Sequence, residues 1–179
     1  MKKSILLLIV LIIFSGCEKK EEKVKEYSYS LISSYETKIY DKIPDRNTNL
    51  TICANAINGY ILPPDKIFSF NDIVGERTYE KGYRDAVIYN EKGEKEMDVG
   101  GGICQISTTI HMAAKNAGLN ITERHNHKRE VPYEALGNDA AVSFNGQDFK
   151  FKNNSQAYIK LEVIINNDIV KANIYKRED

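Results

Sequence analysis

Apolar residues recur at helical spacing in a first segment near residue 50. The positions at i, i+3, i+4 and i+7 are Leu50, Cys53, Ala54 and Ile57. This pattern predicts a helix over about 46–59, with Cys53 on its buried face. Asp45 or Asn47 can cap the start of this helix, and Gly59 ends it.

A second helical pattern covers about 104–117 and ends at Gly118. Its apolar stripe consists of Ile106, Ile110, Ala113, Ala114 and Ala117. A different and more polar face carries Cys104, Ser107, Thr108 and His111. We therefore expect Cys104 to be directed away from the core. His111 follows Cys104 by two turns, about 10 Å of helical rise, and is expected at the surface.

The remaining apolar runs are short and alternate with polar residues, which predicts strands. They cover 27–40, 86–89, 119–127, 140–144, 149–151, 159–165 and 169–175. The polar segment 71–83 predicts a surface loop, 90–98 a charged turn region, and 166–168 a hairpin turn. Helices early and strands late in the chain indicate an α+β fold. We expect the two helices to pack on a mostly antiparallel sheet formed largely by the C-terminal half.

The N-terminus has the pattern of a bacterial lipoprotein signal. Met1-Lys2-Lys3 is basic, and the apolar run at 5–14 is too short for a spanning helix, which needs roughly 20 residues. Phe14-Ser15-Gly16-Cys17 resembles a lipobox, in which the cysteine receives a lipid. We therefore expect a signal peptide over 1–16 and a lipid on Cys17, with an uncleaved anchor as the alternative. Both place the protein at the cell membrane, on its extracytoplasmic face.

Composition predicts one domain on a solvated tether. Residues 17–28 are rich in charge and predict the tether, and 29–179 predicts the domain. Lys and Arg number 25, as do Asp and Glu, so the charge balance gives no indication of nucleic-acid binding. With Cys17 lipidated, the free cysteines are Cys53 and Cys104; a disulfide between them is an alternative outside the cell. The sequence leaves the oligomeric state open.

The stretch Gly100-Gly101-Gly102-Ile103-Cys104 places a thiol at the start of the second predicted helix. The helix dipole and the unpaired backbone N–H groups at this point favour the thiolate, which is the nucleophilic form. The same N–H groups can form an oxyanion hole, and the glycines allow a substrate to approach closely. Candidate oxyanion or substrate-binding residues are Gly102, Gln105 and Ser107. Gln105 can equally cap the helix.

Downstream histidines supply a candidate base for this thiol. His125 and His127 share a face if they lie in one strand, so one can act on Cys104 while the other binds or orients. We slightly favour His125 as the base. Asp139 is a candidate to orient an imidazole, as in catalytic triads. The alternatives are histidines on an exposed strand and an aspartate that forms a turn.

Arginines in the same regions can clamp substrate carboxylates in bidentate fashion. The candidates are Arg77 in the polar loop, Arg124 and Arg129. For each arginine the alternative is a solvated surface charge.

The combination of Cys104 with His125 and His127 also has the ligand types of a catalytic zinc site. A zinc enzyme of this type needs an acidic general base, and no Asp or Glu stands at the sequence spacing that is typical of such a base. We therefore expect neither a metal nor another cofactor.

Several motifs follow one another in order from about residue 30 to 165. They are Arg46-x-x-Asn49, Pro64 to Asn71, Val74 to Thr78, Gly82-Tyr83, Gly100 to Thr109, Glu123 to His127, Gly137 to Val142 and Asp148 to Asn153. In this order and spacing the chain resembles a VanW domain, and the stretch from Gly100 to Thr109 is the most specific part. Asp65 departs from the glycine expected after the proline, which affects only a turn.

The resemblance implies a cell-wall enzyme. VanW-like domains are named from glycopeptide-resistance gene clusters and are associated with peptidoglycan L,D-transpeptidation. Cys104 matches the family's cysteine, and His125 and His127 match its histidines. The implied enzyme takes a tetrapeptide stem, forms a thioester at the carbonyl of the third residue and releases D-Ala. The amine of a neighbouring stem then resolves the thioester.

The implied partners are peptidoglycan stem peptides and, through the lipid on Cys17, the membrane. Two other functions stay open. A cysteine hydrolase uses the same chemistry with water as acceptor, because the choice of acceptor depends on pocket shape and water exclusion. A non-catalytic module binds wall peptides or glycopeptides without turnover.

Overall fold

The computed structural model describes residues 26–90, 92–166 and 168–178 and has a mixed α+β fold, as predicted. The predicted signal peptide, Cys17 and most of the predicted tether lie outside the described residues. The helices are α1 (Pro44–Ile57), α2 (Phe70–Val74) and α3 (Cys104–Asn116), with a 3-10 turn η1 (Tyr79–Lys81). The strands are β1 (Tyr29–Lys38), β2 (Ile61–Leu62), β3 (Ile67–Ser69), β4 (Asp85–Tyr89), β5 (Lys95–Val99), β6 (Asn120–Glu123), β7 (Lys150–Lys152), β8 (Ile159–Ile165) and β9 (Ile169–Arg177).

The strands form three antiparallel groups. A four-stranded sheet has the order β1-β9-β8-β2, a three-stranded sheet has the order β3-β7-β6, and β4 pairs with β5 as a hairpin. The sequence predicted a sheet formed largely by the C-terminal half. In the four-stranded sheet, β8 and β9 lie in the centre as that prediction requires, but β1 and β2 from the N-terminal half form both edges.

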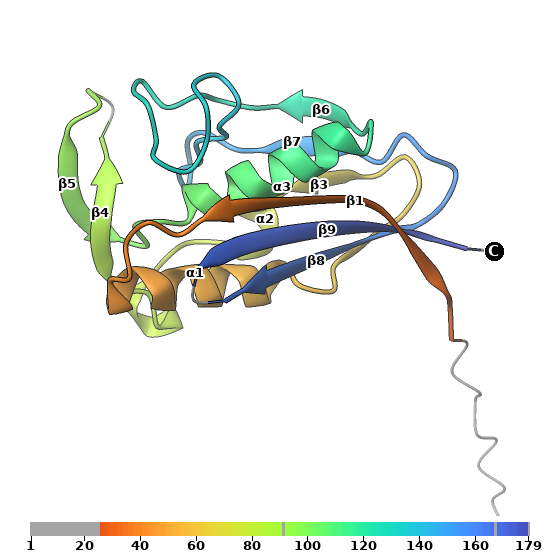
Figure 1. Ribbon diagram of the computed structural model, residues 1–179, viewed down its shortest axis with the longest axis horizontal. Helices are drawn as coiled ribbons and strands as arrows, with labels where there is room; N and C mark the ends of the chain where they lie inside the picture. Colours follow the sequence, from red (N-terminus) through yellow and green to blue (C-terminus); the bar gives the residue numbers. More distant parts are fainter. Residues whose placement is uncertain (1–25, 91, 167, 179) are drawn as a thin grey trace, which may run out of the picture.

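Helix α3 is the central element of the domain. It lies between the four-stranded sheet and the three-stranded sheet, with α1 against the four-stranded sheet at β8 (Figure 1). Every residue from Gln105 to Ala114 is buried. One continuous hydrophobic core contains residues of both long helices and both larger sheets. The described segment from residue 26 on therefore contains a core of its own.

Several local predictions differ from the structure at element ends. Helix α1 starts with Pro44 at its first position, where a missing N–H costs nothing, and no side chain caps it, so Asp45 and Asn47 lie within the helix. The predicted loop 71–83 contains most of α2 and all of η1. The predicted turn at 90–98 contains most of β5, whose five residues all remain at least partly exposed. The predicted strand 140–144 makes one bridge, from Ala141 to His125.

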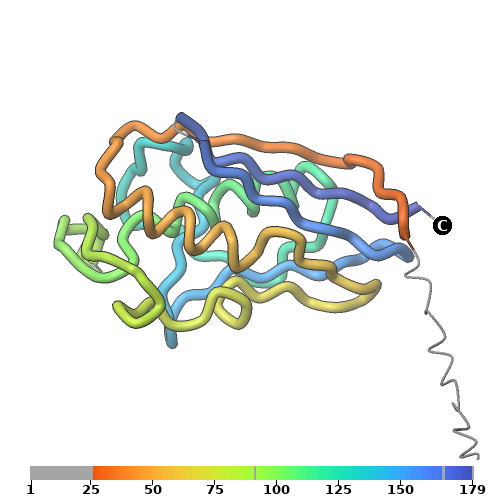
Figure 2. Tube along the Cα trace, turned by 90° about the horizontal axis from the view of Figure 1, so that it is seen from below, coloured from red at the N-terminus to blue at the C-terminus, as the bar shows by residue number. Residues whose placement is uncertain are grey.

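Different parts of the chain lie at the two ends of the molecule. The β4–β5 hairpin projects at one end, whereas residue 26 and the C-terminus lie at the opposite end in both views (Figures 1 and 2). The helices in the described part of the chain all lack the length and apolar character needed to cross a membrane.

Candidate active site

The three consecutive glycines each leave space that another part of the protein fills. A Cβ on Gly101 would lie 2.4 Å from the Ala86 carbonyl oxygen in β4. A Cβ on Gly100 would lie 2.9 Å from the Arg77 Cβ, and one on Gly102 would lie 2.7 Å from the Arg46 Cγ. Gly100 and Gly102 also have φ of +82° and +101°, which side chains disfavour. The glycines thus allow close internal packing, and Gly100 and Gly102 also line the cavity, where the predicted substrate approach stays a prediction.

Helix α1 holds this glycine loop through a buried amide side chain. Asn49 Nδ2 donates to the Gly101 carbonyl at 3.0 Å and to the Arg84 carbonyl at 2.9 Å. The Arg84 N–H donates back to Asn49 Oδ1 at 2.8 Å. Asn49 therefore ties the loop before Cys104 to the start of the β4–β5 hairpin.

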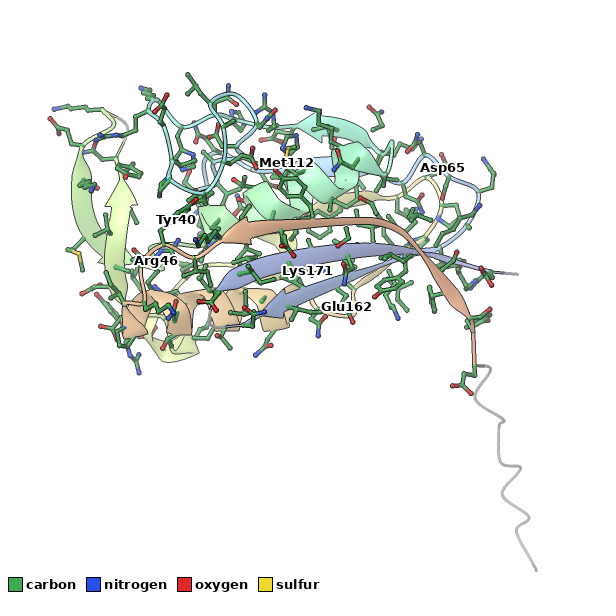
Figure 3. All side chains as sticks on the ribbon, in the orientation of Figure 1. Tyr40, Arg46, Asp65, Met112, Glu162 and Lys171 are labelled. Carbon is green, nitrogen blue, oxygen red and sulfur yellow. The ribbon has the colours of Figure 1, made fainter. Side chains whose placement is uncertain are left out.

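Gln105 is fully buried and holds α3 in place. Its Oε1 accepts from Arg46 Nη2 at 2.6 Å, and its Nε2 donates to Thr37 Oγ1 at 2.9 Å and to the Lys38 carbonyl at 3.0 Å. Arg46 also pairs with Asp41, in the segment between β1 and α1, at 3.1 Å. Figure 3 shows Arg46 at the start of α1. The Gln105 amide is thus engaged between elements and does not cap the helix. Gln105 also lines the cavity over Cys104, so its predicted role toward a substrate stays a prediction.

The polar face of α3 binds the segment 138–142. Ser107 Oγ donates to the Ala140 carbonyl at 2.6 Å, and Thr108 Oγ1 accepts from the Ala140 N–H at 3.0 Å. His111 Nδ1 lies 2.9 Å from the Asn138 carbonyl oxygen and the side chain is 3 % exposed. The predictions of a surface His111 and of a substrate-binding Ser107 are corrected: both fix the segment that carries Asp139.

This docking brings Cys104, His127 and Asp139 together. Asp139 is 1 % exposed, and its Oδ2 accepts from both the backbone N–H and the Nδ1 of His127, each at 2.6 Å. With Nδ1–H facing the carboxylate, Nε2 is the nitrogen left for the thiol. The imidazole is close enough to Cys104 to lower the pKa of its thiol, and the Cys104 Sγ also lies 3.5 Å from the Val142 carbonyl oxygen. The arrangement is a thiol, an imidazole and a carboxylate in series.

The electrostatics of this series favour charge separation. Burial alone raises the pKa of the Cys104 thiol, but the hydrogen bond and the positive charge of His127 hold that pKa below its ordinary value. Burial likewise opposes the charged form of His127, yet Cys104 and Asp139 raise its pKa to about 9. Both shifts favour a thiolate–imidazolium pair at neutral pH.

His125 lies elsewhere, contrary to our slight preference for it as the base. Its Nε2 lies 3.1 Å from Glu123 Oε1, and its side chain is 39 % exposed. The two histidines were expected to share a face of one strand, but β6 ends at Glu123. The His125 carbonyl accepts from the Ala141 N–H, and the chain beyond it leaves the strand path, so only His127 reaches Cys104.

The three candidate arginines have different surroundings. Arg124 donates to Asn126 and, at 2.7 Å, to the Asp139 carbonyl, so it braces the loop around Asp139 rather than a substrate. Arg129 donates to the Gly93 carbonyl at 2.9 Å and lies over the Tyr89 ring. Arg77 lines the same cavity as Cys104 and is 7 % exposed. The structure thus leaves Arg77 as the arginine placed to contact a ligand.

A cavity of about 760 Å³ opens over Cys104. Its walls come from the β4–β5 hairpin, the start of α3, and the loops around Tyr133 and Phe144, and His127 and Gly102 also line it. Within the described ranges, the N–H groups of Gly102 and Cys104 donate to no other protein group, so both are free to bind an oxyanion. Tyr133 is a cavity residue that no sequence pattern indicated.

Cys53 and Cys104 are both free thiols, so the alternative disulfide is absent. Cys53 is fully buried in the core, as predicted for the apolar face of α1, and burial raises its pKa to about 12. For the part of the chain that the structure describes, no three His, Cys, Asp or Glu side chains are grouped so that they could hold a metal ion.

The chain belongs to the family described as VanW like protein, whose model matches residues 45–175. The uncharacterized protein YoaR of Bacillus subtilis is 42 % identical over 132 residues, which are 74 % of this chain and 43 % of that protein. The vancomycin B-type resistance protein VanW of Enterococcus faecalis is 26 % identical over 143 residues, 76 % of this chain and 52 % of that protein. The chain thus spans about half the length of these curated relatives. No solved structure matches it.

Proposed function

We propose that the protein is a cell-envelope cysteine acyltransferase that cross-links peptidoglycan stem peptides by L,D-transpeptidation. One observation carries the proposal: Cys104, His127 and Asp139 stand in series at the start of α3, in a cavity with free backbone N–H groups. Each part needed for acyl transfer is present, namely a nucleophile, an acid–base group with its orienting carboxylate, and oxyanion donors.

The first half of the reaction acylates the enzyme. The Cys104 thiolate attacks the carbonyl carbon of the third residue of a tetrapeptide stem. The resulting oxyanion accepts hydrogen bonds from the N–H groups of Gly102 and Cys104. The imidazolium of His127 then gives its proton to the leaving amine, the C–N bond breaks, and D-Ala departs. The products are a thioester and a neutral imidazole.

The second half returns the enzyme to its starting state. The neutral His127 takes a proton from the amine of a neighbouring stem as that amine attacks the thioester. The C–S bond breaks, the new amide forms, and the thiolate–imidazolium pair is restored. Asp139 keeps the imidazole in one tautomer and stabilises its charged form throughout.

The cellular setting in the proposal has two sources. The relative in Enterococcus faecalis is named a vancomycin B-type resistance protein, which is consistent with action on cell-wall precursors or cross-links. The N-terminal sequence supports export and lipidation at Cys17. We therefore place the domain on the extracytoplasmic face of the membrane, where peptidoglycan stems are accessible.

The proposal is tested with purified disaccharide-tetrapeptide muropeptides and the chain from residue 18 on. Mass spectrometry is expected to show cross-linked dimers and released D-Ala. Cys104→Ala is expected to lower the rate by about four orders of magnitude or more, because it removes the nucleophile. Cys53→Ala is the matched control, since it removes the other domain thiol without touching the cavity.

Each other outcome identifies a different function. Loss of D-Ala without dimers indicates a hydrolase that uses the same residues with water as acceptor. Stoichiometric binding without turnover, equal in the wild type and in Cys104→Ser, indicates a wall-binding module. Dimers that persist in Cys104→Ala refute Cys104 as the nucleophile.

A further inference from the structure

Arg77 is a buried cation held rigidly in the wall of the cavity. It follows α2, is 7 % exposed, and lines the same cavity as Cys104. Its Nη2 donates to Asn71 Oδ1 at 2.8 Å. Asn71 is itself fixed, because its Nδ2 donates to the carbonyls of Ser143 and Gln147 at 3.0 Å each. The guanidinium therefore has a defined position before any ligand arrives.

Arg77 forms no ion pair with a carboxylate among the described residues, although Asp148 and the Cys104 thiolate act on its charge from a longer distance. Its Nε and Nη1 are buried and lack a hydrogen-bond partner there. The rings of Phe70 and Phe144, at 5.6 Å and 6.0 Å, contribute cation–π attraction but accept none of these hydrogen bonds. A buried charge without a partner is costly, so proteins rarely keep one without a use.

Arg46 shows what a structural arginine looks like in this protein. It is also 7 % exposed and also packs against the glycine loop, yet it pairs with Asp41 at 3.1 Å and with Gln105 at 2.6 Å. Arg77 makes the same approach to the loop and also has an amide partner, Asn71, but it lacks the carboxylate that Arg46 has in Asp41. The difference between the two points to an anion that comes from outside the chain.

The position of Arg77 sets where this anion binds. A Cβ on Gly100 would meet the Arg77 Cβ at 2.9 Å, so the base of the arginine side chain packs on the loop that ends at Cys104. Its guanidinium lines the cavity and interacts electrostatically with Cys104. Consecutive residues of a peptide are about 3.8 Å apart. A carboxylate one residue beyond the attacked carbonyl is therefore within the reach of a group that neighbours the nucleophile loop.

We propose that Arg77 binds the terminal carboxylate of the acyl donor and so restricts the enzyme to stems that end one residue beyond the attacked carbonyl. The identity of the donor rests on the proposed function, whereas carboxylate binding in the cavity does not. Arginine suits this task, because its planar group donates several hydrogen bonds to a carboxylate. The enzyme then selects chain ends and rejects internal peptide bonds.

The test compares a disaccharide-tetrapeptide with the same compound carrying a C-terminal D-alaninamide. The two differ only in the terminal carboxylate. We expect the wild type to prefer the free acid by about 10- to 100-fold in kcat/KM, mostly through KM, as for a hydrogen-bonded charge. Arg77→Gln is expected to abolish the preference and Arg77→Lys to keep part of it. Arg129→Gln, at the exposed hairpin contact, is expected to leave it unchanged.

The ratio of the two donors separates this role from a purely electrostatic effect on the thiolate. If Arg77 only stabilised the thiolate, Arg77→Gln would slow both donors equally and the preference would remain, which would overturn the proposal. Equal use of the acid and the amide by the wild type would also overturn the proposal.

A binding measurement keeps the inference independent of catalysis. Calorimetry with Cys104→Ser is expected to show tighter binding of the acid than of the amide, and the double variant Cys104→Ser/Arg77→Gln is expected to lose the difference. If the wild type turns over neither donor while this difference persists, the proposed function fails and carboxylate recognition stands. Equal affinities for acid and amide in Cys104→Ser refute the inference itself.

Discussion

At the scale of single residues, His127 owes its role to Asp139. One carboxylate oxygen accepts from the backbone N–H and from Nδ1 of the same histidine, which fixes both the position and the tautomer of the ring. The Tyr89 ring and the imidazole form a T-shaped pair, with centroids 6.4 Å apart. These contacts leave the ring one orientation, with its second nitrogen toward Cys104.

The first prediction concerns the ionisation of Cys104, measured by alkylation with iodoacetamide as a function of pH. The wild type is expected to react below the ordinary thiol range, because His127 lowers the pKa of the buried thiol. His127→Asn removes the lowering partner and leaves burial, so the pKa rises and the rate at pH 7 falls by about 10- to 100-fold. His125→Asn, two residues away, is the control and should match the wild type. If His125→Asn instead raised the pKa of Cys104 and His127→Asn matched the wild type, the base would be His125.

The second prediction concerns the alkaline limit of turnover. The pKa of His127 is raised to about 9, so its proton is present at neutral pH and is lost as the pH rises through that value. Acylation needs this proton for the leaving amine, so kcat/KM is expected to fall above about pH 9. A pH–rate profile of D-Ala release measures this limit. A profile that keeps rising through pH 10 would show that the imidazolium is not the acid.

Residue types near Cys104 could be found from the sequence, but the pairing of side chains could not. Cys104 and Asp139 carry the roles that their motifs indicated, if the proposed chemistry holds. The choice between His125 and His127 depends on where β6 ends, and that is set by the docking of 138–142 onto α3 rather than by local pattern. Gln105 looked available because its partners, Thr37 and Arg46, are more than fifty residues away in sequence.

At the scale of elements, α3 is a buried helix with two polar edges. Gln105 and Thr109 lie one turn apart and both contact Thr37 of β1, the latter at 2.8 Å. Ser107, Thr108 and His111 form the second edge and bind the backbone of 138–140. A stripe of apolar residues predicted this helix correctly, whereas hydrogen-bonded polar residues inside a core look like surface residues in a single sequence.

The third prediction tests how α1 positions the nucleophile loop. Asn49→Ala leaves the carbonyls of Gly101 and Arg84 and the Arg84 N–H without their buried partner. We expect a loss of about 2–4 kcal/mol in the free energy of unfolding, measured in urea, together with a lower kcat at temperatures where the variant is folded. Thr48→Ala, on the exposed side of α1, is the control and should change stability by less than about 0.5 kcal/mol. Equal effects of the two substitutions would contradict a positioning role for Asn49.

The fourth prediction separates collision from backbone strain at two glycines. Gly101 lacks a positive φ, but a Cβ there would lie 2.4 Å from the Ala86 carbonyl oxygen, so Gly101→Ala must push β4 away. We expect a cost of about 3 kcal/mol and loss of activity. Gly118 has φ +71° and open space around it, so Gly118→Ala should cost only about 1 kcal/mol and leave activity intact. Urea unfolding and D-Ala release measure both; a harmless Gly101→Ala would refute the packing argument.

The second strand of the β4–β5 hairpin was not predicted from the hydrophobic pattern. This strand, Lys95–Val99, is largely charged and lies mostly in solvent, so the sequence looked like a turn. Cross-strand pairing to Asp85–Tyr89 and the fit of Gly101 under Ala86 define it instead. By contrast, β8 at Ile159–Ile165 has the predicted bounds, because it alternates strictly and lies on the core.

At the scale of the whole molecule, both ends of the described chain meet in one sheet. β1 pairs with β9 along its full length, from Tyr29 with Arg177 to Lys38 with Ile169. Such a pairing depends on long-range packing, which no local pattern reports. Its consequence is that β1 runs from the tether side of the domain to the cavity, where Lys38 forms part of the wall.

The last prediction follows from this arrangement. A strand rises about 3.3 Å per residue, so the cavity end of β1 lies about 30 Å from its start at Tyr29 (Figure 1). If Cys17 carries the lipid, the tether joins the domain at the end opposite the cavity. Cys17→Ser is then expected to move the protein from the membrane fraction to the soluble fraction, as shown by fractionation and by loss of lipid mass. Its turnover of soluble muropeptides should stay within about twofold of wild type, because the described residues that line the cavity lie between Lys38 and Asn145. Cys53→Ser is the matched control and should remain in the membrane fraction. Retention of Cys17→Ser in the membrane, with residues 1–16 still attached, would instead identify an uncleaved anchor.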